Sequence, residues 1–246
     1  MRILLIRHAD PDYEHDSLTP KGFREAAALA QYFSDKEENL GDCYVSTCGR
    51  AMDTAGPSLR AMGKEAVACD WLREFSEQTI LRPDMGGKRK LSWDWLPQDW
   101  TQHEEFYRYD EWYKQPIMAE GGIGDYAKSV TDPLDELLAK NGYVRDGHIY
   151  RVEQESDKTI TLFCHFGVGC VILGHLIGAS PMVLWHGFAA APSSITTIYT
   201  EERRKGIASF RVWSYGETPH LTLSGEDRSF SARFCECYDF EHERHD

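Results

Sequence analysis

Short apolar runs alternate with amphipathic stretches over the first 70 residues, and this alternation restricts the possible folds more than any other feature. The first run is aliphatic without helical periodicity and ends at Arg7-His8. Thr19 and Pro20 suit the N-cap and the first residue of the helix that follows. The predicted strands and helices cover residues 2–6, 23–33, 42–47, 49–62 and 66–70. This β-α-β-α-β order predicts an α/β fold, a three-layer sandwich whose central sheet is mostly parallel, with helices on both faces.

The rest of the chain extends this pattern and adds one irregular region. Further helices and strands are predicted at residues 125–140, 159–164, 167–177, 195–200 and 209–215. We place the last two, both strands, at an edge of the sheet. Residues 76–118 break the pattern and carry eight Trp, Tyr and Phe residues among many acidic ones. Such a segment suits either a lid over a pocket or a locally packed surface subdomain. We expect one domain over residues 1–246, with this segment as an aromatic-rich cap or insertion.

Charge and composition narrow the possible partners. The 246 residues carry a formal net charge of −13 with a pI near 5.2, which argues against nucleic acid and anionic membranes. No signal peptide is visible and the seven cysteines are scattered, as is typical of reduced thiols, so we expect a cytoplasmic protein. The sequence shows no metal-ligand cluster or cofactor motif, so neither a metal nor a cofactor is expected. It does not indicate an oligomeric state, and we expect the acidic tail, residues 236–246, to be exposed.

Four polar side chains lie where predicted strands end and helices or loops begin. Arg7 and His8 follow the first strand, at the edge where open α/β sheets bind ligands. Arg50 lies in the first turn of a helix, where free amides favour an anion, and His165 ends a later strand. A guanidinium can bind two phosphate oxygens, and an imidazole can attack phosphorus. Singly, Arg50 suits a solvated helix start and His165 a structural histidine, so only their combination indicates a phosphoryl site.

Glu74 is a candidate for proton transfer. It follows the third predicted strand, where a carboxylate could protonate a leaving oxygen and then deprotonate water. Glutamate is abundant in this region and Glu77 lies nearby, so position alone supports Glu74 only weakly.

In order and spacing, the chain resembles the histidine phosphatase superfamily, which has the phosphoglycerate-mutase-like fold. The resemblance rests on four short segments that occur in the family's order. These are Leu5-Ile6-Arg7-His8-Ala9, Leu18-Thr19 with Gly22, Ser46-Thr47 with Arg50-Ala51 and Thr54-Ala55, and the strand ending in His165 before Gly167.

The resemblance implies a role for each candidate residue. His8 would be the nucleophile and would form a phosphohistidine intermediate, while Arg7, Arg50 and His165 would bind the phosphoryl group. Glu74 would be the proton donor. The implied activity is metal-independent hydrolysis of a small phosphorylated substrate, with inorganic phosphate as product.

Two departures from the family pattern bear on the type of reaction. Phe166 follows the second histidine, where the family commonly has glycine, and could narrow the pocket. The acidic segment at residues 10–16 lacks the continuation typical of glycolytic mutases and would repel a multiply charged sugar phosphate. Both features favour a phosphatase. A phosphoglycerate-mutase-type phosphomutase and a catalytically silent phospho-ligand binding protein remain the alternatives.

Overall fold

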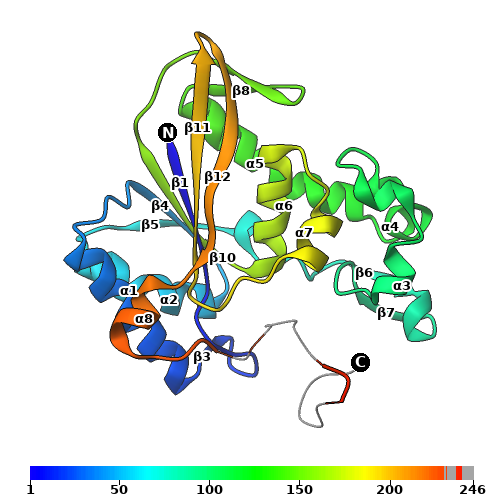
Figure 1. The fold of residues 1–246 in the computed structure, drawn as a ribbon, viewed down its shortest axis with the longest axis horizontal. Helices are drawn as coiled ribbons and strands as arrows, with labels where there is room; N and C mark the ends of the chain where they lie inside the picture. Colours follow the sequence, from blue (N-terminus) through cyan, green and yellow to red (C-terminus); the bar gives the residue numbers. More distant parts are fainter. Residues whose placement is uncertain (230, 232–236, 240–246) are drawn as a thin grey trace.

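The computed structural model describes residues 1–229, 231 and 237–239, and its centre is an eight-stranded sheet (Figure 1). The strand order is β5-β4-β10-β1-β11-β12-β9-β8. The bounds are β1 (Arg2–Arg7), β4 (Asp42–Ser46), β5 (Ala66–Cys69), β8 (Tyr143–Asp146), β9 (Ile149–Val152), β10 (Thr159–Cys164), β11 (Ile195–Arg204) and β12 (Ile207–Glu217). Strands β5, β4, β10 and β1 are parallel neighbours, and the remaining pairings are antiparallel. The predicted α/β class with a parallel core is therefore confirmed.

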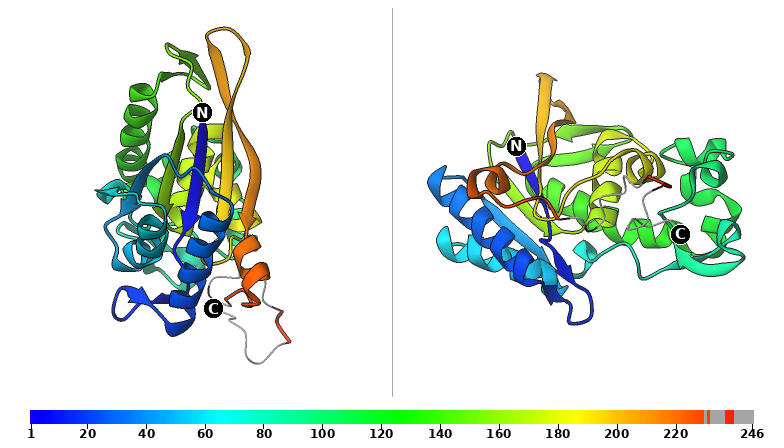
Figure 2. Two further views of the ribbon diagram at one scale, coloured as in Figure 1. Left: turned by 90° about the vertical axis from the view of Figure 1, so that its left-hand side faces the viewer. Right: turned by 60° about the horizontal axis from the view of Figure 1, so that its bottom comes forward.

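Side chains of β1 alternate between the two faces of the sheet, and each face is covered by helices. Leu4 and Ile6 share a buried cluster with one helical layer, whereas Ile3 and Leu5 belong to the cluster on the opposite side. The first layer contains α1 (Pro20–Asp35), α2 (Gly49–Ala61) and α8 (Pro219–Ser224), and the second contains α5 (Ile123–Lys140), α6 (Phe166–Ile177) and α7 (Pro181–Gly187). The two layers lie on opposite sides of the sheet in Figures 1 and 2. Because parallel strands need crossover connections, this chain order produces the three-layer arrangement.

The start of α1 follows the sequence signals. The Gly22 amide donates to the Thr19 hydroxyl at 3.1 Å, and Pro20 is the first helical residue. The predicted helical body at residues 23–33 lies within α1, which begins at Pro20 behind this cap and ends at Asp35, and the other predicted helices match α2, α5 and α6 within two residues. In the part of the chain that the structure describes, no helix has the length and apolar character needed to cross a membrane.

The predicted place of the last two strands is wrong. β11 pairs with β1 and β12, and β12 pairs with β9, so both are interior strands. The edges are β5 and β8, and β8 forms a short hairpin with β9. These two strands have four residues each with mixed polarity, so neither gives a clear apolar pattern. The tail prediction falls largely on residues that the structure does not describe.

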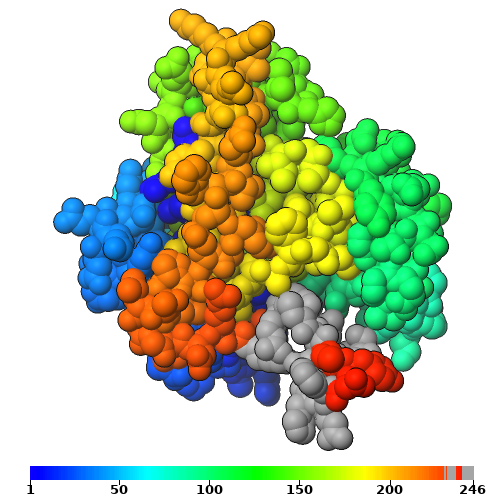
Figure 3. Space-filling view, viewed as in Figure 1, coloured from blue at the N-terminus to red at the C-terminus, as the bar shows by residue number. Residues whose placement is uncertain are grey.

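The aromatic segment is packed against the second helical layer. It contains η2 (Pro83–Met85), η3 (Glu104–Tyr107), η4 (Trp112–Lys114), β6 (Thr79–Arg82), β7 (Lys88–Leu91), α3 (Pro97–Trp100) and α4 (Pro116–Glu120). The rings of Trp112 and Trp185 of α7 meet edge to face at 5.4 Å, and the Trp95 amide donates to His186 Nε2 at 2.9 Å. Trp95 and Trp112 belong to the same buried cluster as α5, α6 and α7. Figure 3 shows this segment and α7 forming one continuous surface.

Two further hairpin strands and one short helix complete the described elements. β2 (Pro11–Asp12) and β3 (Ser17–Leu18) pair with each other after β1, and η1 (Asp70–Leu72) follows β5. The acidic segment identified in the sequence, residues 10–16, comprises β2 and the loop that leads to β3, and one residue separates η1 from Glu74.

Candidate active site

His8 follows β1, and the backbone of the next residue orients its ring. Its Nδ1 lies 2.7 Å from the carbonyl oxygen of Ala9. Because a carbonyl oxygen can only accept, Nδ1 carries the ring proton and the lone pair is on Nε2. Burial and, to a smaller extent, the charge of Arg7 lower the pKa of His8 well below its usual value. His8 is therefore neutral near pH 7, with Nε2 in the form that can attack phosphorus.

His165 lies at the junction of β10 and α6, beside His8. The two ring centroids are 5.0 Å apart with the planes at 57°. His165 Nε2 is 2.8 Å from the Ser46 hydroxyl, which also accepts from the Cys48 amide at 3.2 Å. In the tautomer in which the Ser46 hydroxyl donates to Nε2, the ring proton of His165 is on Nδ1, a buried atom for which the described residues supply no partner. Burial, followed by the influence of His8, lowers the pKa of His165 well below its usual value.

Arg7 and Arg50 bring positive charge to these rings. Arg7 is buried and donates from Nη1 to the carbonyl oxygen of Ala190. Arg50, in the first turn of α2, pairs with Asp16 at 2.5 Å. In both arginines Nε is buried and has no partner among the described residues. The charges of both arginines contribute to the lowered pKa of His8.

Asp16 binds to the start of α2 as an anion would. Its Oδ1 pairs with Arg50 and its Oδ2 accepts from the Gly49 amide at 2.7 Å. The acidic loop predicted to repel an anionic substrate thus points towards the candidate site. Helix N-termini favour anions, so this carboxylate and a phosphoryl group compete for the same type of contact.

Glu74 lies at the N-terminus of α6, the helix that follows His165. Its Oε1 accepts from the Phe75 amide at 2.8 Å and from the Val168 amide at 3.0 Å. A Cβ atom on Gly167 would lie 2.6 Å from Glu74 Oε1 and 3.0 Å from Trp93 Nε1. Glycine at position 167 is therefore required for the carboxylate to approach the helix this closely.

The structure brings all five predicted residues to the carboxyl edge of the parallel strands. Two neighbours were missed as functional candidates by the sequence reasoning. Arg73 donates to the Thr47 hydroxyl at 3.3 Å, and its charge helps to lower the pKa of His165. Thr54 accepts from the Ala9 amide at 2.9 Å and donates to the Arg50 carbonyl at 2.7 Å, which joins the two arginine segments. Thr54 lies inside one of the segments that carry the family resemblance, and Arg73 directly precedes Glu74, so these positions were the available signals.

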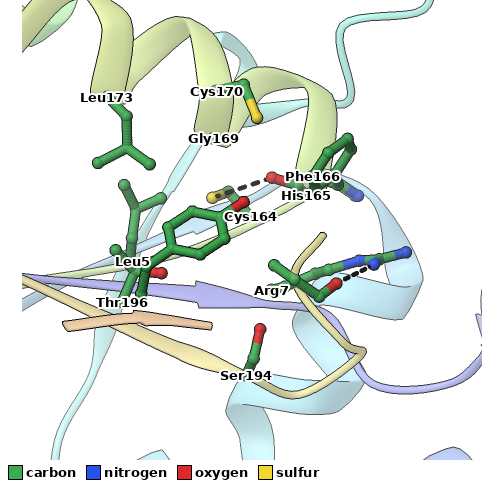
Figure 4. A pocket seen from close by; sticks show the side chains of 12 residues that line it. Leu5, Arg7, Cys164, His165, Phe166, Gly169, Cys170, Leu173, Ser194 and Thr196 are labelled. Atoms are coloured by element: carbon green, nitrogen blue, oxygen red, sulfur yellow. Dashed lines mark hydrogen bonds between the residues drawn. The ribbon is translucent and has the colours of Figure 1, made fainter. Parts of the chain in front are cut away.

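Phe166 packs between the site and the aromatic segment. Its ring lies 5.7 Å from the Arg7 guanidinium carbon and meets the Trp93 ring at 6.0 Å. Figure 4 shows a cavity in which Arg7, His165 and Phe166 face Leu5 and Leu173. Its volume of about 20 Å³ is too small for a phosphate group. A phosphoryl group in contact with these residues would therefore have to lie outside this cavity.

A family model for the histidine phosphatase superfamily (branch 1) matches residues 3–212. The chain belongs to this superfamily. No curated protein matches the sequence. The resemblance inferred from the four motif segments is thereby confirmed at the level of the superfamily.

Solved structures of superfamily phosphatases share the fold of this histidine phosphatase superfamily member. A mutant phosphoserine phosphatase from Entamoeba histolytica, in complex with phosphoserine, has a TM-score of 0.58 and 19% identity over 89% of this chain and 98% of its own. The alpha-ribazole phosphatase from Shigella flexneri has a TM-score of 0.54 and 19% identity, covering 89% and 97%. A mycobacterial glucosyl-3-phosphoglycerate phosphatase in complex with VO3 has a TM-score of 0.52 and 19% identity, covering 87% and 98%.

Proposed function

We propose that this protein is a metal-independent phosphomonoesterase that acts on a small phosphorylated metabolite through a phosphohistidine intermediate on His8. The observation that carries this proposal is the state of the His8 ring. Its Nδ1 proton is held by the Ala9 carbonyl, which leaves Nε2 as a nucleophile beside Arg7, Arg50 and His165. The enzymes with similar folds are phosphatases, which agrees with this reaction class.

In the first step, His8 Nε2 attacks phosphorus and the bond to the leaving oxygen breaks. Charge spreads over the three remaining phosphoryl oxygens, and fixed positive groups stabilise it. Among the described residues, Arg7 Nε, Arg50 Nε and His165 Nδ1 have no hydrogen-bond partner, and as N–H donors they are suited to these oxygens. Glu74 is the group that supplies a proton to the leaving oxygen.

In the second step, Glu74 acts as a base. Its carboxylate accepts a proton from water while the water oxygen attacks phosphorus, and the bond to His8 Nε2 breaks. Inorganic phosphate is released and Glu74 is protonated again, so the cycle is closed.

The test is hydrolysis of para-nitrophenyl phosphate in the presence of EDTA by the wild-type protein, the His8→Ala variant and the His15→Ala variant. His15 provides a matched control because it is an exposed histidine of the nearby loop. We expect activity that survives EDTA, disappears in His8→Ala and persists in His15→Ala. Acid-labile, alkali-stable labelling of His8 by a radioactive phosphate ester would identify the intermediate.

The alternatives are distinguished by two additions to this experiment, an acceptor alcohol and a measurement of phosphate binding. A phosphomutase would label His8 but transfer the phosphoryl group to an added acceptor alcohol in preference to water. A silent binding protein would bind inorganic phosphate without turnover on a broad panel of phosphoesters. Full activity in His8→Ala would refute the proposed mechanism.

A further inference from the structure

The segment at residues 190–194, between α7 and β11, holds the backbone of the Arg7-His8 pair at several points. The Arg7 amide donates to the Ser194 carbonyl at 3.1 Å, and the Ser193 amide donates to the His8 carbonyl at 3.0 Å. The Arg7 side chain also donates to the carbonyl of Ala190 (Figure 4). A change in this segment would therefore move both the nucleophile and its neighbouring arginine.

Ser193 is the unusual residue of this segment. Its φ is +61°, in the left-handed region that L-residues rarely adopt, and its side chain is completely buried. This conformation turns the chain so that the Ser193 amide faces His8 while the next carbonyl faces Arg7. Strained residues of this kind persist only where their surroundings fix them.

His220 of α8 supplies that restraint. The Ser193 hydroxyl and His220 Nε2 are hydrogen-bonded at 2.8 Å, and His220 is only 1% exposed. The imidazole lies beside α1, with its ring centroid 6.5 Å from that of Tyr32. Burial lowers the pKa of His220 to about 4, so the ring is neutral at pH 7.

We infer that Ser193 and His220 are positioning residues for phosphoryl transfer, because their hydrogen bond fixes the segment that fixes Arg7 and His8. This inference rests on the proposed function. Neither residue touches the reacting atoms; each acts through the His8 carbonyl and the orientation of the His8 ring. The inferred path runs from α8 through Ser193 to the nucleophile.

The test compares Ser193→Ala, His220→Phe and the double variant with the wild type. Attack requires close alignment of Nε2 and phosphorus, and a displacement near 1 Å can reduce turnover by about 100-fold. We expect kcat to fall roughly 10- to 100-fold in each single variant while KM changes less than about 3-fold. Because the two substitutions remove the same hydrogen bond, the kcat of the double variant should be no lower than that of the slower single variant.

Ser180→Ala is the matched control for loss of a buried serine hydroxyl. Ser180 caps α7 and donates to the Phe106 carbonyl, away from His8. We expect this variant to lower the thermal midpoint without changing kcat at 25 °C. Ser193→Ala with a lowered midpoint and unchanged kcat would reduce Ser193 to a structural role and overturn the inference. Additive losses in the double variant would likewise show that the two residues do not act through one bond.

A second readout separates this inference from the proposed function. In ¹H–¹⁵N spectra of the histidine rings, assigned with the His8→Ala variant, the His8 Nδ1–H signal reports its bond to Ala9. We expect Ser193→Ala and His220→Phe to shift this signal and Ser180→Ala to leave it in place. If the wild type shows no His8-dependent hydrolysis, the proposed function fails while the ring signals still test positioning. Unshifted His8 signals in both site variants would refute the positioning role.

Discussion

Asp16→Asn should make this protein a tighter binder of phosphomonoesters. The Asp16 carboxylate pairs with Arg50 at 2.5 Å and accepts from the Gly49 amide at 2.7 Å. An incoming phosphoryl group must displace these contacts to reach the arginine. Asparagine keeps the shape and one oxygen acceptor and tolerates the local φ of +47°, so the substitution removes chiefly the charge.

The expected change in binding free energy follows from the solvent exposure of the Asp16–Arg50 ion pair. The Asp16 side chain is 50% exposed and that of Arg50 is 12% exposed, so the ion pair contributes at most about 1 kcal/mol. The interaction of the carboxylate with the helix terminus adds roughly 0.3–1 kcal/mol. Removing a competing interaction of about 1–1.5 kcal/mol should lower both the KM and the inhibition constant of phosphate by roughly 5- to 13-fold. kcat should change less than about 2-fold, since binding in the ground and transition states improves alike.

The assay is steady-state hydrolysis with phosphate as competitive inhibitor at low and high salt. Asp12→Asn is the control because it removes the same charge from the same loop, whereas Asp12 bonds to His15 and not to Arg50. The gain in Asp16→Asn should shrink at high salt, where exposed charges are screened. Equal decreases in KM in both variants would indicate that the overall negative charge of the loop, and not the contact of Asp16 with Arg50, weakens phosphate binding. A higher KM in Asp16→Asn would mean that Asp16 orients Arg50, contrary to the competition argued from the structure.

Three further outcomes are expected. Gly167→Ala should lower kcat by roughly 10²–10⁴-fold because the added Cβ would displace the Glu74 carboxylate. Gly169→Ala is the control: its Cβ would meet only Leu5 at 3.6 Å, so its kcat should be nearly unchanged. Equal kcat values for the two variants would contradict this prediction. The acid limb of kcat/KM should lie well below pH 6.5, and Arg50→Gln should move it upwards because it removes a charge that lowers the His8 pKa. Thermal stability should be highest above pH 6.5 and fall on acidification, because burial lowers the pKa of several histidines and the unfolded chain then binds more protons. These are His8, His165, His186 and His220. A thermal midpoint that rises from pH 6.5 to pH 5 would refute this sign.

The predicted family and fold class are confirmed because both depend on local patterns. The central strands β1 and β10 are mainly apolar and buried, and Arg7, His8, Arg50 and His165 stand at the end of a parallel strand or in the first turn of the helix that follows it. Parallel strands bring those ends to one edge of the sheet, so sequence order alone places Arg7, Arg50 and His165 together. Their roles, and that of Glu74, remain predictions until the variants are measured.

Contacts between distant segments could not be predicted in this way. The approach of Asp16 to Arg50 depends on a left-handed residue at the end of the acidic loop, and sequence reasoning concluded only that the loop would repel anions. The bond between Ser193 and His220 joins a left-handed serine to a six-residue helix that no apolar periodicity revealed. Such contacts are set by tertiary packing and carry no local signal.

Phe166 and the aromatic segment were separate departures from the family pattern in the sequence, but the structure joins them into one packing unit. Glycine after the second histidine would leave the Arg7 guanidinium uncovered on that side, whereas the Phe166 ring lies 5.7 Å from it. Exposing the Phe166 ring to water would be unfavourable. Trp93 of the aromatic segment packs against this ring edge to face, with the ring centroids 6.0 Å apart. Trp93 also donates to the Phe75 carbonyl at 2.8 Å, next to Glu74. The segment therefore packs against both Phe166, which covers Arg7, and the backbone next to Glu74, which is why a bulky residue can occupy the position of the family's glycine.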